Sequence, residues 1–128
     1  MSIGILIITH NEVGNDILST ARDIFGALPA NTTVISIKPN SDYDKKLVET
    51  RHSITELDTG DGVLVLTDIF GATPCNIALK AAKHTNTKVV AGINLPMLVR
   101  VLNYAHLPLK KIVDKAVSAG HDSIFECQ

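Results

Sequence analysis

The sequence has little cysteine, no long run of charges of one sign and no long hydrophobic stretch. Its two cysteines, Cys75 and Cys127, lie far apart and form no Cys-x-x-Cys pair. The first residues show no basic segment followed by a cleavable apolar stretch, so we expect a cytoplasmic protein with reduced thiols. The apolar runs are only a few residues long, well short of the ~20 residues of a membrane-spanning helix. We therefore expect no insertion into a membrane.

The charges are balanced, with 12 Lys and Arg against 13 Asp and Glu and a formal net charge of -1. This balance argues against a basic surface that binds nucleic acid or an anionic membrane. The expected partners are therefore proteins or small molecules. A chain of 128 residues predicts one domain, 1–128, which buries roughly two thirds of the surface that the unfolded chain exposes.

Short apolar segments rich in β-branched residues alternate with segments of helical periodicity. Residues 3–8 are apolar without alternation, which is typical of a strand covered on both faces in a parallel sheet. Further strands are predicted at residues 33–37, 62–67 and 88–92, with helices after each of them and a final strand at residues 123–127. This order predicts an α/β fold with an open, doubly wound, mostly parallel sheet in the flavodoxin-like order 2-1-3-4.

Two polar residues, His10 and Asp68, follow the first and third predicted strands. In the flavodoxin-like order these strands are neighbours, and a ligand cleft is expected outside their carboxyl ends. A carboxylate bonded to one imidazole nitrogen fixes the tautomer and leaves the other nitrogen free as a nucleophile or base. A lone histidine is usually an ordinary core or surface side chain. Here the matching carboxylate favours a catalytic pair, and no third ligand for a metal is visible.

The segment Gly71-Ala72-Thr73-Pro74 resembles the start of a helix. We expect Thr73 to be the N-cap and Pro74 the first helical residue, which would leave backbone N–H groups directed into the same cleft. Such helix ends attract anions, phosphate above all, although many caps have no further role. A histidine facing an anion site suits phosphoryl chemistry, in which imidazole attacks phosphorus and the N–H groups hold the oxygens. This chemistry needs no metal and no cofactor.

Three motifs give the chain a family resemblance: Thr9-His10, residues 68–76 and residues 92–98. Together they resemble the IIA component of the mannose (mannose–fructose–sorbose) family of the bacterial phosphoenolpyruvate:sugar phosphotransferase system. The resemblance implies that His10 accepts a phosphoryl group from the phosphocarrier protein HPr and passes it to a IIB component in sugar uptake and phosphorylation. It implies further that Asp68 pairs with the imidazole and that the phosphate-binding residues are Thr9, Gly71, Ala72 and Thr73.

The same resemblance implies a homodimer in which residues 123–127 add a strand to the sheet of the other subunit. The family often has glycine and serine where this chain has Ala72 and Thr73, and both replacements keep a small side chain or a hydroxyl. Because the sequence ends at Gln128, a IIB component is expected on a separate chain, if one exists.

Other functions stay open at this level. One is a stand-alone regulatory module, in which the phosphorylation state of His10 controls binding to a protein partner without sugar transport. Another is a thiol hydrolase that uses Cys75 with His10 and Asp68. Three further residues could form a lip of the cleft or a partner contact, or only the start of a helix: Asn94, Pro96 and Met97.

Overall fold

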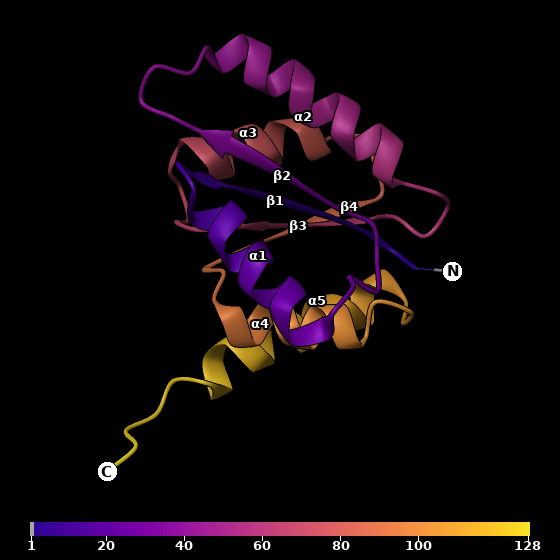
Figure 1. Cartoon of the computed structure of the whole chain (residues 1–128). Coiled ribbons are helices and arrows are strands. Elements are labelled where there is room, and N and C mark those ends of the chain that lie inside the picture. Colours follow the sequence, from indigo (N-terminus) through magenta and orange to yellow (C-terminus); the bar gives the residue numbers. More distant parts are fainter. Residues whose placement is uncertain (1) are drawn as a thin grey trace.

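A four-stranded parallel sheet lies between two layers of helices in the computed structural model, which describes residues 2–128 (Figure 1). The strand order β2-β1-β3-β4 confirms the predicted fold class and topology. Along the chain the elements are β1 (Gly4–His10), α1 (Val13–Phe25), β2 (Thr32–Ile37), α2 (Tyr43–Leu57), β3 (Val63–Thr67), α3 (Thr73–Ala82), β4 (Thr87–Ala91), α4 (Leu95–Asn103) and α5 (Leu109–Asp122). Among these described residues, no helix is long and apolar enough to cross a membrane.

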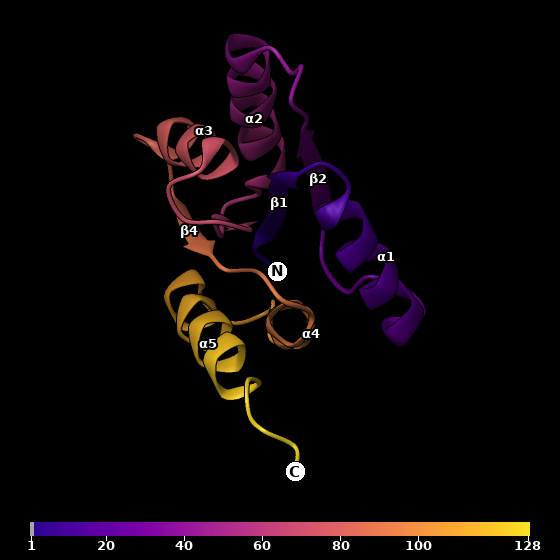
Figure 2. The same cartoon turned by 90° about the vertical axis from the view of Figure 1, so that its left-hand side faces the viewer.

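Each face of the sheet has its own core. Helices α2 and α3 cover one face, and α1, α4 and α5 cover the other (Figure 2). Strand β1 supplies both cores, because Leu6 and Ile8 point to the first and Ile5 and Ile7 to the second. All four side chains are fully buried, and each such burial contributes roughly 1.5–3 kcal/mol. Burial on both faces explains why the strand sequence does not alternate.

The parallel register brings the ends of three strands to one edge of the sheet. His10 pairs with Ile37 of β2, and Ile8 pairs with Thr67 of β3. The residue after Thr67 is Asp68, so the register places it beside the end of β1. The connection from β2 into α2 starts at this same edge. This edge therefore gathers side chains that are far apart in the sequence.

The predicted strand at residues 123–127 does not form within the chain. After α5 the chain runs away from the body of the molecule without regular structure (Figures 1 and 2). A strand needs a neighbour for its backbone groups, and within residues 2–128 the outer side of β4 has none. The tail does not fold back onto that edge.

Candidate phosphoryl-transfer site

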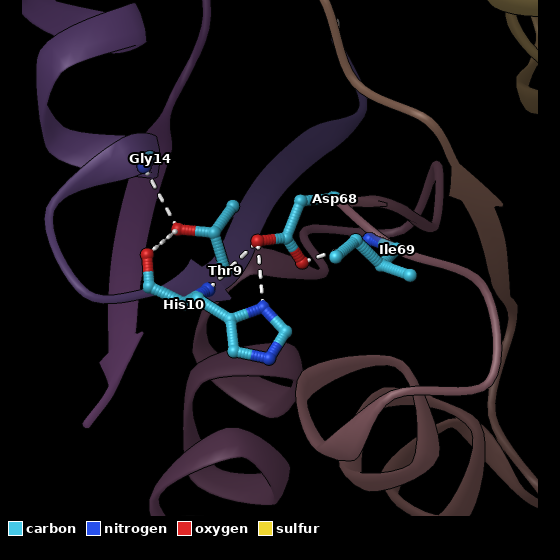
Figure 3. Close-up of polar contacts among 5 residues, drawn as sticks. All are labelled: Thr9, His10, Gly14, Asp68 and Ile69. Carbon is cyan, nitrogen blue, oxygen red and sulfur yellow. Dashed lines mark hydrogen bonds and ion pairs between the residues drawn. The ribbon is translucent and has the colours of Figure 1, made fainter. Parts of the chain in front are cut away.

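The structure brings the two predicted catalytic residues into contact. Nδ1 of His10 lies 2.9 Å from Oδ2 of Asp68, and the backbone N–H of His10 donates to the same oxygen at 2.9 Å (Figure 3). The other carboxylate oxygen, Oδ1, accepts from the backbone N–H of Ile69 at 2.9 Å. The Asp68 side chain is 14% exposed, whereas that of His10 is 40% exposed. The carboxylate is thus enclosed by donors while the imidazole reaches solvent.

These contacts keep Asp68 ionised. Partial burial by itself raises the pKa of the carboxyl, but hydrogen bonds from the His10 backbone, the His10 ring and the Ile69 backbone outweigh burial and lower the pKa below its ordinary value. An ionised carboxylate only accepts hydrogen bonds, so Nδ1 of His10 carries the proton. In the neutral ring Nε2 then holds a free lone pair, and Figure 3 shows that nitrogen directed away from Asp68.

Thr9 holds the backbone on both sides of the turn that follows His10. Its hydroxyl donates to the carbonyl of His10 at 3.2 Å and accepts from the backbone N–H of Gly14 at 2.8 Å. A Cβ at Gly14 would lie 2.9 Å from Ile7 Cγ2 and 3.0 Å from this hydroxyl, so the close approach requires glycine. Thr9 is fully buried. This geometry assigns Thr9 to holding the turn after β1, in contrast to the phosphate contact expected from the sequence.

The N-cap of α3 is not Thr73, the residue predicted from the sequence. Ala72 is the N-cap, and Thr73 and Pro74 form the first turn of the helix. Alanine has no side-chain acceptor, and no side chain bonds to the cap. Pro74 has no N–H, and helix geometry leaves the N–H of Thr73 without an acceptor inside the helix. Thr73 is exposed, so its N–H and hydroxyl are available to an anion.

Gly71 and Asn76 shape this loop. Gly71 has φ of 84°, a left-handed conformation that favours glycine. Its carbonyl accepts from Nδ2 of Asn76 at 3.1 Å. The role of Asn76 could not be predicted from the sequence, because a side-chain hydrogen bond back to the preceding loop has no distinct sequence signal.

A cleft of about 380 Å³ opens beside the histidine. His10 and Thr73 contribute to its lining, whereas Gly71 and Ala72 do not. The remaining lining comes mainly from the β2–α2 connection and from α2, and its polar members are Asn11, Lys38, Ser41, Tyr43 and Lys46. No motif in the sequence predicted this wall of the cleft. The available signal was topological, since the segment after β2 had to start at the same sheet edge as His10.

Asn94, Pro96 and Met97 do not line the cleft beside His10. Oδ1 of Asn94 accepts from the backbone N–H of Met97 at 2.9 Å and caps α4, while Nδ2 donates to the carbonyl of Gly120 at 3.2 Å. Asn94 and Met97 line a separate cavity of about 180 Å³ between β4 and α5. Pro96 lies in the first turn of α4. The helix-start interpretation fits this geometry, and a contact of these residues with a partner stays a prediction.

Cys75 is buried in the first turns of α3 and is only 1% exposed. A nucleophilic thiol must reach its substrate. The position therefore argues against the thiol hydrolase alternative and fits an ordinary core residue.

Nearly the whole chain matches one family model, which covers residues 4–117 and is described as EIIA-man, PTS system fructose IIA component. The chain belongs to the EIIA-man family. Its relatives include the PTS system mannose-specific EIIAB component of Escherichia coli strain K12, 33% identical over 103 residues, or 80% of this chain and 32% of that protein. The EIIA-man chain thus spans about a third of the length of this relative.

Further similarities agree with this membership. The PTS system fructose-specific EIIA component of Bacillus subtilis strain 168 is 39% identical over 67 residues, which are 51% of this chain and 46% of that protein. The crystal structure of phosphotransferase system component EIIA from Streptococcus agalactiae superposes with a TM-score of 0.87 and 25% identity, covering 97% of this chain and 96% of that one. Membership of the EIIA-man family supports a phosphotransfer role in a sugar phosphotransferase system.

Proposed function

We propose that His10 accepts a phosphoryl group from phosphorylated HPr on Nε2 and transfers it to a IIB component on a separate chain. One observation supports this proposal above all: Asp68 holds Nδ1 of the ring at 2.9 Å and leaves Nε2 free at the cleft. No feature of the described residues favours the alternative of a regulatory module without transport.

The proposed step is a direct exchange of one phosphorus–nitrogen bond for another. The lone pair of His10 Nε2 bonds to phosphorus while the donor's P–N bond breaks, and the electron pair of that bond stays on the donor nitrogen. Nδ1 keeps its proton, so the phosphorylated ring is positively charged, and the Asp68 carboxylate balances this charge. Transfer to the histidine or cysteine of a IIB component repeats the exchange with His10 as the donor.

The first turn of α3 is the proposed phosphate-binding element. The phosphoryl group carries about two negative charges near neutral pH. Thr73 lines the cleft with His10, so its N–H and hydroxyl are the proposed donors to the phosphoryl oxygens, and the positive end of the helix dipole adds to their effect. Gly71 and Ala72 contribute by holding the main chain of this loop open to an incoming group.

Exposed apolar side chains beside Asp68 fit a protein partner. Phe70 is 81% exposed, and Ile69 next to it is also largely exposed. Large apolar side chains that gather beside a reactive group are typical of interaction surfaces. We propose that HPr and IIB both contact this loop when their reacting residues approach His10.

The C-terminal tail and the edge of β4 support a homodimer. Ile124 and Phe125 are exposed on a segment without regular structure. The outer backbone groups of β4 have no neighbouring strand within residues 2–128. An exposed strand edge is a template for another chain. We propose that residues 123–127 of one subunit pair with β4 of the other.

Incubation with phosphoenolpyruvate, HPr and the enzyme that phosphorylates HPr tests the proposed function. We expect intact-mass spectrometry to show one added phosphoryl group on the wild-type chain and none on His10→Ala. His121→Ala, which removes an exposed histidine from α5, serves as the control and should be labelled like the wild type. An unmodified wild-type chain, or label that persists in His10→Ala, would refute the proposal.

A further inference from the structure

The wall of the cleft that faces α3 carries two lysines, Lys38 and Lys46. We propose that the ammonium group of Lys46 is a second holding group for the phosphoryl group on His10, opposite the first turn of α3. This inference rests on the proposed function of His10. It assigns a phosphate contact to α2, an element that none of the three sequence motifs includes.

Lys46 lies on the wall of the cleft that His10 also lines. It lies in the first turns of α2, and its side chain lines the same cleft as His10 and Thr73. Helices α2 and α3 pack side by side on one face of the sheet (Figure 2). Lys46 on α2 and Thr73 at the start of α3 both line the cleft. The Lys46 side chain is 27% exposed, whereas Lys38 is 55% exposed. Lys46 is therefore the better shielded of the two cations.

The ion pair between Lys46 and Glu49 is weak. Nζ of Lys46 lies 3.5 Å from Oε1 of Glu49, which is about half exposed. This separation exceeds the ~2.7–2.9 Å of a strong charge-assisted hydrogen bond. Exposed ion pairs of this kind contribute little to stability. The ammonium group can therefore turn toward a phosphoryl dianion at small cost.

The charge balance of the site favours such a contact. The carboxylate of Asp68 balances the positive ring of phosphorylated His10, which leaves about two negative charges on the phosphoryl oxygens. The N–H groups and dipole at the start of α3 supply only partial positive charge, about half an elementary charge. A lysine on the opposite wall supplies a full positive charge and holds the oxygens from the other side.

The test compares three variants of the full chain. Lys46→Met removes the charge and keeps the length of the side chain, and Lys46→Arg keeps the charge. Lys45→Met is the matched control, because Lys45 is the neighbouring residue on α2, is exposed and does not line the cleft. Each protein is phosphorylated with phosphoenolpyruvate, HPr and its activating enzyme. The rate of labelling is measured, and the phosphorus NMR resonance is followed as a function of pH.

We expect Lys46→Met to be labelled about fivefold more slowly than the wild type. Its phosphorus resonance should titrate at higher pH, because a neighbouring cation favours the dianion. Lys46→Arg should restore both properties, and Lys45→Met should match the wild type. Equal behaviour of Lys46→Met and Lys45→Met, or a Lys46→Arg variant that behaves like Lys46→Met, would overturn the inference while the function of His10 stands. A wild-type chain that takes no label would instead refute the proposed function.

Discussion

Asp68 contacts the residue at the centre of the site twice, through the ring and through the backbone N–H of His10. The ring bond fixes the tautomer, and the backbone bond fixes the position of the strand end that carries the ring. Because the carboxylate also accepts from Ile69, its orientation does not depend on His10 alone. One side chain therefore determines both where the imidazole lies and which nitrogen is free.

Replacement of Asp68 should change the pH dependence of stability. Its pKa in the folded chain lies below the ordinary value of 3.8. Such a group contributes stability above its unfolded pKa, and this contribution is lost as pH falls through the folded pKa. We expect Asp68→Asn to lower the free energy of unfolding by about 1–2 kcal/mol at neutral pH, and the difference from wild type to shrink below about pH 4.

Denaturant unfolding between pH 2 and 7 measures this effect. Asp114→Asn is the control, because it removes the same charge from an exposed position on α5. It should leave the free energy of unfolding close to that of wild type. A constant difference between Asp68→Asn and wild type over the whole range would contradict the assignment.

At the scale of elements, the loop before α3 connects the end of β3 to the first turn of α3, the proposed phosphate-binding element. Its conformation depends on Gly71, whose φ is 84°, and on the bond from Asn76 to the Gly71 carbonyl. A Cβ at Gly71 would meet no atom within 4 Å. Any loss of stability on replacing Gly71 therefore comes from the left-handed backbone conformation and not from a steric clash. The same holds for Gly26 at the end of α1, where φ is 81°.

This similarity provides a matched pair of variants. We expect Gly71→Ala and Gly26→Ala each to lower the free energy of unfolding by about 1 kcal/mol, because each forces a left-handed conformation on alanine. Only Gly71→Ala should slow phosphorylation by HPr, since Gly26 lies where α1 ends, away from the cleft. Thermal unfolding and the labelling rate provide the two measurements. Equal labelling rates in the two variants would argue against a role for the loop.

Some features of these elements could be predicted from the sequence and others could not. Strand β1 could be predicted because residues 3–8, which are buried on both faces of the sheet, are apolar without alternation. The position of Asp68 beside His10 followed from parallel topology. The cap of α3 could not be predicted, because capping preference favours Thr73 and the backbone instead places Ala72 there. The position of Lys46 in the cleft could not be predicted for another reason. It depends on how α2 packs on the sheet, and no local sequence pattern encodes that packing.

At the scale of the whole molecule, two exposed phenylalanines lie on separate surfaces. Phe70 lies two residues after Asp68, and Phe125 lies on the C-terminal tail. The proposals assign them different partners: the phosphocarrier protein contacts the first, and a second copy of the chain binds the second. The two assignments can be tested separately by replacing each phenylalanine in turn, because each variant serves as the control for the other.

We expect Phe125→Asp to shift the chain from dimer to monomer in sedimentation velocity, because a charge on the exchanged segment opposes its burial against β4. Phe70→Asp should stay dimeric and should react more slowly with phosphorylated HPr. A wild-type chain that sediments as a monomer at all concentrations would refute the proposed dimer. A Phe125→Asp chain that remains a dimer would exclude the tail as its interface.

The account depends on a single arrangement, in which Asp68 occupies one nitrogen of His10 and leaves the other to react. The most direct test identifies the phosphorylated nitrogen by NMR of the 15N-labelled, phosphorylated chain. We predict the phosphorus–nitrogen coupling on Nε2, with a proton retained on Nδ1. A phosphoryl group on Nδ1 would contradict the account, because that nitrogen would then have lost its bond to Asp68.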